Sequence, residues 1–278
     1  MIYQLTIAWL YPDLMSTYGD RGNIIVLEKR CQRRNIETEI ESITLETPLK
    51  ELEACDLVFM GGAQDRQQKI TGEDFFKNKG PVVKKMVEKN IPALFVCAAY
   101  QAVGNYYRPY KGEDIPGAGI FDLTTIHPGD QAQRLIGNVA AEIIDDYKFL
   151  MSFPRRRESI VSKVWIPDQV RDDKKRWKNT IVGFENHGGR TYLGDKMKPL
   201  ARVKRGFGNN GEDGYEGAIY KNAIGSYFHG PILTKNPHLA DWLITRALEI
   251  KYTKVVELEP LDDTLEWKAH EFILKRLK

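Results

Sequence analysis

The stretch Ile91–Gly104, IPALFVCAAYQAVG, decides the fold that this sequence predicts. Its apolar run ends at Cys97, and the small residues Ala98 and Ala99 lead into a segment with helical spacing. A strand, a sharp turn and a helix with a thiol at the turn form a typical site for a nucleophile, which would face the positive end of the helix. The alternative is a small buried hydrophobe, because cysteine is among the most buried residue types.

Strand and helix patterns alternate through the first hundred residues. Strand candidates lie at residues 3–10, 35–43, 55–60 and 91–97. Asp20 is placed to cap a helix over Ile24–Arg34. This alternation predicts an α/β fold with a mostly parallel central sheet and helices on both faces. Functional residues gather at the C-terminal ends of such strands, so we expect the Gly61-Gly62 turn and Cys97 to face one another.

The second half of the chain has a different texture. Short segments rich in Gly, Thr and Asn follow Ile115 and predict an antiparallel extension beside the site. Pro237–Tyr252 has helical spacing, and Leu261–Lys278 predicts a final amphipathic helix that packs on the domain or on a partner. We expect one domain over residues 1–278, with a core at about 2–250 and a helical tail at 255–278.

Composition places the chain among soluble globular proteins. It has 278 residues, of which 42% are hydrophobic and 28% charged. No apolar run approaches the roughly 18 residues that span a bilayer, and the N-terminal segment reads as a first strand and not as a signal peptide. Three widely spaced cysteines without CxxC indicate neither a disulfide framework nor a zinc site. A reducing cytoplasm is the simplest location.

One segment, Ser152–Lys178, interrupts this pattern. It carries nine Lys and Arg residues against four Asp and Glu residues. Its local net charge of +5 (nine minus four) exceeds the net charge of +3 for the whole chain. The basic balance therefore belongs to this segment and does not indicate nucleic-acid binding by the protein as a whole. The segment resembles peptides encoded by palindromic repeat elements that insert into bacterial genes, and we expect a flexible surface loop. A specific RNA or membrane contact through Arg155–Arg157 is the alternative.

A Cys97 nucleophile requires a base, and the chain has five histidines. His238 and His270 fall on predicted terminal helices, where a solvated side chain is expected. His229 ends an apolar strand before Gly-Pro, and His187 lies in the FENHGGR segment. A Cys–His pair can attack an acyl carbon, because imidazole lowers the effective pKa of the thiol and later protonates the leaving amine. Spacing alone does not choose between His187 and His229.

Seven motifs in matching order carry a family resemblance. They are YGDRGN (18–23), GGAQDR (61–66), CAAYQAVG (97–104), RLIGNV (134–139), GFENHGGRTYLG (183–194), GFGNN (206–210) and YFHGPILTKN (227–236). The chain resembles class I, triad-type glutamine amidotransferases of flavodoxin-like fold, in the branch shared with cobyric acid synthase. Within that branch it is similar to the GatD family of glutaminase subunits, from about Ile2 to Glu249 without the insertion.

The resemblance implies roles for individual residues. Cys97 would be the nucleophile and His229 the base, with Gln101 and His187 near the site. Arg134 falls on the family's glutamine-binding arginine, and a guanidinium can hold an α-carboxylate bidentately; otherwise it would read as an exposed strand residue. The oxyanion donors would be backbone N–H groups of Ala98 and of the Gly61-Gly62 turn.

The sequence departs from its relatives in two places. Many triad amidotransferases have an acid two positions after the base, but here His229 is followed by Gly230-Pro231. The family implies that the orienting carboxylate comes from elsewhere, including the partner subunit, and an unoriented imidazole would give low isolated activity. Ala98-Ala99 stands where relatives carry Gly-Gly, which would cost stability if φ were positive there.

The implied activity is hydrolysis of glutamine to glutamate and ammonia through a Cys thioester. The ammonia would pass to a MurT-like ligase that amidates D-glutamate in the lipid II stem peptide. The chain lacks GxxxxGK[ST], so ATP and Mg²⁺ are expected on the partner, and this chain is expected to hold neither cofactor nor metal. The alternatives are an amidotransferase for a corrinoid-type acceptor and a catalytically weak partner-binding subunit.

Overall fold

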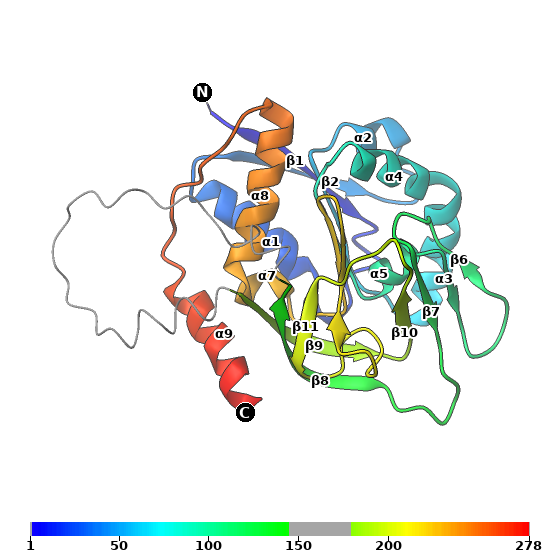
Figure 1. Ribbon diagram of the computed structural model, residues 1–278. Coiled ribbons are helices and arrows are strands. Elements are labelled where there is room, and N and C mark those ends of the chain that lie inside the picture. Colours follow the sequence, from blue (N-terminus) through cyan, green and yellow to red (C-terminus); the bar gives the residue numbers. More distant parts are fainter. Residues whose placement is uncertain (1, 145–178, 278) are drawn as a thin grey trace.

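The computed structural model describes residues 2–144 and 179–277 and contains the predicted parallel sheet (Figure 1). Its strands are β1 (Gln4–Leu10), β2 (Glu37–Ile43), β3 (Leu57–Met60), β4 (Ala93–Val96), β13 (Ala218–Tyr220) and β14 (Ala223–Ser226). They are ordered β13-β14-β4-β3-β1-β2, and all neighbours are parallel except the edge pair β13 and β14. Every residue of β3 and β4 is buried, as expected for central strands covered on both faces.

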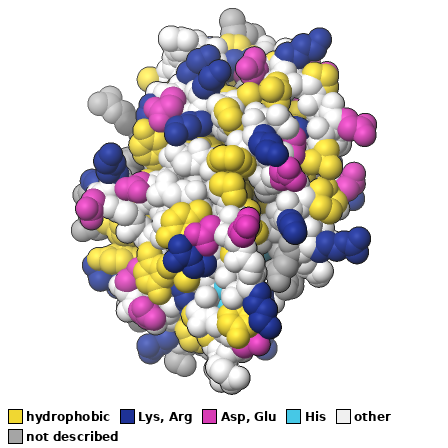
Figure 2. Space-filling model, turned by 90° about the vertical axis from the view of Figure 1, so that its right-hand side faces the viewer, with side chains coloured by type: hydrophobic (Ala, Val, Ile, Leu, Met, Phe, Trp, Pro, Cys, Tyr) yellow, Lys and Arg dark blue, Asp and Glu magenta, His cyan; other side chains and the backbone are white. Residues whose placement is uncertain are grey.

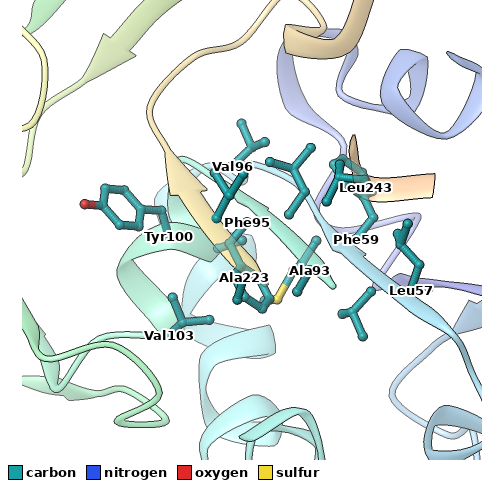
Figure 3. Packing of buried hydrophobic residues seen from close by; sticks show 14 of the residues in the cluster. Leu57, Phe59, Ala93, Phe95, Val96, Tyr100, Val103, Ala223 and Leu243 are labelled. Carbon is teal, nitrogen blue, oxygen red and sulfur yellow. The ribbon is translucent and has the colours of Figure 1, made fainter. Parts of the chain in front are cut away.

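Helices cover both faces of this sheet (Figure 1). One face holds α1 (Arg21–Gln32), α7 (Ile232–Lys235) and α8 (Pro237–Tyr252). The other holds α2 (Leu49–Glu53), α3 (Asp65–Asp74), the π-helical turn η2 (Phe75–Lys79), α4 (Gly80–Glu88) and α5 (Ala98–Ala102), and the short 3-10 helix η1 (Thr17–Gly19) precedes α1. Figure 3 shows Leu243 of α8 and Val103, next to α5, packed on opposite sides of the strands. The predicted α/β fold is confirmed.

The predicted extension forms two four-stranded sheets. One contains β5 (Tyr106–Arg108), β6 (Ile115–Pro116), β7 (Leu123–Ile126) and β10 (Arg190–Leu193). The other contains β8 (Leu135–Ile143), β9 (Thr180–His187), β11 (Ala201–Arg205) and β12 (Tyr215–Glu216). All described pairs in them are antiparallel except β5 with β7. The predicted insertion at 152–178 lies outside the described residues, and the strands on either side of it pair directly.

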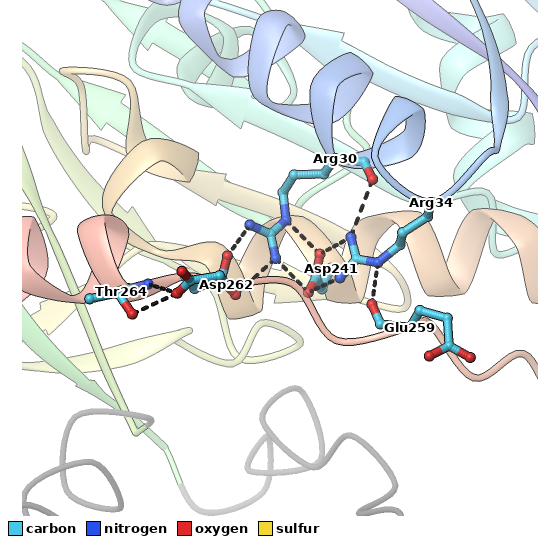
Figure 4. A network of polar contacts seen from close by, with 7 residues as sticks. Arg30, Arg34, Asp241, Glu259, Asp262 and Thr264 are labelled. Carbon is cyan, nitrogen blue, oxygen red and sulfur yellow. Dashed lines mark hydrogen bonds and ion pairs between the residues drawn. The ribbon is translucent and has the colours of Figure 1, made fainter.

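A buried ion-pair network ties the C-terminal segment to the domain (Figure 4). The guanidinium of Arg30 on α1 lies 2.6 Å from carboxylate oxygens of both Asp241 on α8 and Asp263. Arg34 lies 2.8 Å from Asp241 and donates to the carbonyl of Glu259 at 2.7 Å. These contacts fix the chain that leads into the last helix, α9 (Thr264–Arg276).

The tail helix exists as predicted, but two histidine environments were predicted wrongly. His270 is fully buried; its Nε2 lies 2.8 Å from Thr180 Oγ1, and its Nδ1 donates to the Lys235 carbonyl oxygen at 2.7 Å. His238 is buried in a stack with Trp267 of α9, with ring centroids 5.2 Å apart. Both side chains are buried because α9 packs onto β8, β9 and α7. Burial lowers the pKa of His270 to about 4.

Figure 2 shows basic and acidic side chains interspersed over the face that it presents. Among the described residues, no helix combines the length and apolar character needed to cross a bilayer.

Candidate active site

Cys97 occupies a strained turn between β4 and α5. Its φ is 56° and its ψ is −105°, and its N–H donates to the Ser226 carbonyl at 2.9 Å. Ala98 and Ala99 are helical and neither has a positive φ, so the cost considered for these alanines does not arise. The strain rests on the cysteine itself, as in the nucleophile turn of hydrolases.

We expect Cys97→Gly to unfold at higher urea concentration than Cys97→Ala. A non-glycine residue in such a region costs about 1–3 kcal/mol, whereas glycine adopts positive φ freely at an entropic cost of about 0.4–1 kcal/mol. The net gain should be about 1 kcal/mol in the free energy of unfolding, measured by urea denaturation. Equal stability of the two variants would show that the turn relaxes without the thiol.

His229 lies at the same strand edge as Cys97, as predicted. Strand β14 runs parallel to β4 with Ser226 opposite Val96, so the residues after both strands are neighbours. The His229 imidazole and the Cys97 side chain both lie against Gly62, and Cys97 acts electrostatically on the imidazole. Burial lowers the pKa of His229, but Cys97 and the Asp20 carboxylate outweigh it and raise the pKa above its usual range. The raised pKa favours the protonated imidazole, which is the form that can stabilise a thiolate and protonate a leaving amine.

Asp20 is the site residue that sequence reasoning missed. Its Oδ1 lies 3.1 Å from Nδ1 of His229, and its side chain is fully buried. The residue does precede α1, but its side chain makes no capping hydrogen bond, so the predicted capping role is wrong. The chain itself thus supplies a carboxylate to the imidazole, and low isolated activity is no longer expected from an unoriented base. The YGDRGN motif was the available signal.

The Gly61-Gly62 turn faces Cys97, as predicted. A Cβ on Gly62 would lie 2.7 Å from Cε1 of His229 and 3.4 Å from Cβ of Cys97, and one on Gly61 would lie 2.5 Å from the Met15 carbonyl oxygen. Close approach therefore requires glycine at both positions. The Gly62 N–H donates to Oδ2 of Asp20 at 2.7 Å, so its predicted use as an oxyanion donor requires that bond to open. Ala98 begins α5, where an N–H has no acceptor within its own helix.

Gly62→Ala is expected to lower kcat for glutamine hydrolysis about 100-fold, because the new methyl group displaces the imidazole of His229 and misplacement of about 1 Å costs this much. The matched control is Gly72→Ala, whose Cβ would meet only Ile115 Cγ2 at an ordinary 3.5 Å. Initial rates of glutamate release measure both variants. A Gly62→Ala enzyme with wild-type kcat would show that the turn moves away from His229.

Arg134 and His187 lie beside this edge. The exposed Arg134 donates from Nε to Oδ1 of Asn186 at 3.0 Å and from Nη2 to the Asn186 carbonyl at 3.1 Å. His187 is the next residue, and its ring stacks on Tyr227 with centroids 3.6 Å apart. Tyr227 precedes His229 by two positions, so the predicted near-site position of His187 matches the structure.

Comparisons with known proteins agree with this geometry. Residues 6–237 match the family model of the CobB/CobQ-like glutamine amidotransferase domain. The chain is 34% identical over 277 residues to the lipid II isoglutaminyl synthase (glutamine-hydrolyzing) subunit GatD of Staphylococcus aureus, covering 99% of this chain and 97% of the relative. The GatD subunit of Streptococcus pneumoniae is also 34% identical, with 97% and 90% covered. The chain belongs to the GatD family of CobB/CobQ-like glutamine amidotransferases.

More distant relatives support the fold. A probable cobyric acid synthase of Methanosphaera stadtmanae is 28% identical over 77% of this chain but only 39% of the relative. The glutaminase domain of Trypanosoma brucei CTPS has a TM-score of 0.54 at 14% identity, covering 92% of this chain and 98% of that one. A solved glutamine amidotransferase has a TM-score of 0.51 at 15% identity, covering 86% and 98%.

A buried hydrogen-bond network connects Gln101 to Tyr227. Gln101 accepts from Gln68 at 2.8 Å and donates to the Tyr227 hydroxyl at 3.1 Å, and that hydroxyl lies 2.6 Å from Thr191 Oγ1. Gln101 is therefore hydrogen-bonded to Tyr227, two residues before His229. The described residues hold no group of three or more His, Cys, Asp or Glu side chains arranged to bind a metal ion.

Glu216 holds the strand end that carries His229. Its Oε1 accepts from Ser226 Oγ at 2.6 Å and from the Tyr227 N–H at 2.9 Å. Burial raises the pKa of Glu216 to about 8 from an ordinary value of 4.5. The folded chain therefore binds more protons than the unfolded chain between these values, and its stability falls as pH rises. The contribution is complete below pH 4.5 and is lost as pH rises through about 8.

Glu216→Gln should consequently become more stable than wild type as pH rises from 5 to 8, by up to about 4 kcal/mol at pH 8. Glutamine keeps an acceptor for Ser226 and Tyr227 but does not ionise. Urea denaturation at pH 5, 6.5 and 8 measures the difference. The exposed Glu73, whose pKa is lowered by Lys77, is the control position, because Glu73→Gln should show no advantage that grows over this range. A difference that shrinks with pH would contradict the assignment.

Proposed function

We propose that this chain is the glutaminase subunit of a lipid II isoglutaminyl synthase. The observation that carries the proposal is the placement of the His229 imidazole beside both Cys97 and the Asp20 carboxylate, in a chain that matches GatD subunits over nearly their whole length. The proposal places the reaction in the cytoplasm, on glutamine and with a MurT-like ligase subunit as partner.

The geometry supports a thioester route. The Cys97 thiolate attacks the side-chain amide carbon of glutamine, and the N–H of Ala98 at the start of α5 stabilises the oxyanion. His229 gives its proton to the departing ammonia, while Asp20 holds the imidazole in place. His229 then removes a proton from the water that hydrolyses the glutamyl thioester, which releases glutamate and restores the thiol.

The second half of the reaction belongs to the partner. ATP and Mg²⁺ would be bound by the ligase subunit, which would use the ammonia to amidate the α-carboxyl group of D-glutamate in the lipid II stem peptide. Two arguments for a non-catalytic subunit lose their basis, because the alanines after Cys97 are helical and Asp20 supplies a carboxylate. The corrinoid alternative has weaker support, because this chain spans less than half of the cobyric acid synthases that it matches.

The test is nitrogen transfer from [amide-¹⁵N]glutamine. The chain is co-purified with its Mur-ligase-like partner and supplied with ATP, Mg²⁺ and lipid II. We expect ¹⁵N in amidated lipid II, and none when Cys97→Ala replaces wild type. Label in a corrinoid acid offered as competitor would redirect the acceptor, and no ammonia from any acceptor mixture would overturn the glutaminase assignment.

A further inference from the structure

His187 presents an unused hydrogen-bond acceptor. Its side chain is only 2% exposed, and its Nε2 is buried without a hydrogen-bond partner. Its Nδ1 lies 2.8 Å from the carbonyl oxygen of Gly189. A carbonyl only accepts, so Nδ1 carries the proton and Nε2 carries a lone pair. Burial lowers the pKa of His187 to about 3, which keeps the ring neutral.

This acceptor lies near Arg134, the residue expected to bind glutamine, and near His229. His187 stacks on Tyr227, which leads to His229, while the preceding Asn186 receives both hydrogen bonds of Arg134. The charges that act on the His187 ring include those of Arg134 and His229. His187 is therefore a near neighbour both of Arg134 and of the base of the Cys–His pair.

Hydrogen-bond donors converge next to it. A Cβ placed on Gly188 would lie 3.2 Å from Nε2 of His127 and 3.4 Å from Nη1 of Arg134, so both side chains reach the glycine that follows His187. The N–H of Gly129 donates to Nδ1 of His127 at 3.2 Å, which leaves the His127 proton on Nε2. Two donors thus lie around Gly188, the residue after the one that carries the neutral acceptor.

We propose that Nε2 of His187 accepts a hydrogen bond from the α-ammonium group of glutamine, while Arg134 and His127 donate to the α-carboxylate. One carbon of the substrate carries both groups, so a carboxylate on Arg134 places the ammonium beside the next residue after Asn186. A buried acceptor without a partner costs free energy until a donor fills it, which makes the site select amino acids over simple amides. This inference rests on the proposed glutaminase function.

Three substrates separate the two recognition elements: glutamine, glutaramate, which lacks the α-amino group, and 4-aminobutanamide, which lacks the α-carboxylate. Ammonia release by the full chain with its partner gives kcat/KM for each. His187→Phe keeps the ring stack on Tyr227 but removes the acceptor. We expect its kcat/KM for glutamine to fall about 10- to 100-fold, with little change for glutaramate, because a hydrogen bond to a charged group has this magnitude.

Arg134→Leu is the matched control. It should lose discrimination against 4-aminobutanamide and keep discrimination against glutaramate, the reverse of His187→Phe. If His187→Phe leaves the ratios of kcat/KM among the three substrates as in wild type, the proposal is overturned. An equal fall for all three substrates would show that the role of His187 is structural. A selective loss for 4-aminobutanamide would assign Nε2 to another substrate group and contradict the proposal.

Calorimetric binding of the same compounds to Cys97→Ala protein, with and without His187→Phe, separates this proposal from the proposed function. A chain that binds glutamine over glutaramate only through His187, yet releases no ammonia as wild type, would fail as a glutaminase and still satisfy the binding assignment. Binding with no dependence on His187 would contradict the assignment, whatever the activity.

Discussion

Cys97→Ser is expected to reduce glutamate release at saturating glutamine at least about 1,000-fold, because an alcohol is far less readily ionised than a thiol beside the same imidazole. The substitution changes one atom at the end of β4 and leaves the turn in the same backbone conformation. Its free energy of unfolding should stay within about 0.5 kcal/mol of wild type. A discontinuous assay of glutamate, with the partner subunit present, measures the rate.

The other two cysteines are the matched controls. Cys31 and Cys55 are buried, and burial raises their pKa values to about 11 and 12, so neither forms a thiolate near neutral pH. Cys31→Ser and Cys55→Ser should keep wild-type kcat. Residual activity above one tenth of wild type in Cys97→Ser would place the nucleophile elsewhere.

The predictable part of this molecule is the part encoded locally. The apolar runs of β3 and β4 indicate buried parallel strands, and such strands end at a common edge, so the approach of Gly61-Gly62 to Cys97 follows from the sequence. The position of His229 does not follow from local sequence, because β14, the strand before it, pairs with β4 from far along the chain. The family resemblance separated it from His187, which spacing alone could not do.

The missed features depend on tertiary contacts. Asp20 and His229 are 209 positions apart, and an aspartate before a helix is by local rules a capping residue. Its side chain turns instead to the imidazole and to the Gly62 N–H, because the segment after β1 lies beside the end of β3. The burial of His238 and His270 likewise arises only when α9 packs against the domain.

Asp20→Asn is expected to lower kcat about 100- to 10,000-fold while the fold is kept. The carboxylate accepts from two donors, the imidazole Nδ1 and the Gly62 N–H, through its two oxygens. Asparagine has one oxygen and one NH₂ group, so it cannot accept from both. If its NH₂ faces His229, the imidazole proton moves to Nε2 and the ring no longer serves as a base toward Cys97. The loss for such a tautomer change in a catalytic triad is of this size.

The matched control is Asp241→Asn, which also replaces a buried carboxylate but lies in the Arg30–Arg34 network away from the thiol. It should lose about 3–5 kcal/mol of stability, because breaking a buried ion pair leaves uncompensated charge, and the folded fraction should keep wild-type kcat. Asp20→Asn should show the opposite pattern, with a large loss of kcat and a smaller change in urea midpoint. Since KM reports glutamine binding through other residues, it should change little in either variant. A kcat within threefold of wild type in Asp20→Asn would mean that the imidazole is oriented by another group, including one supplied by the partner.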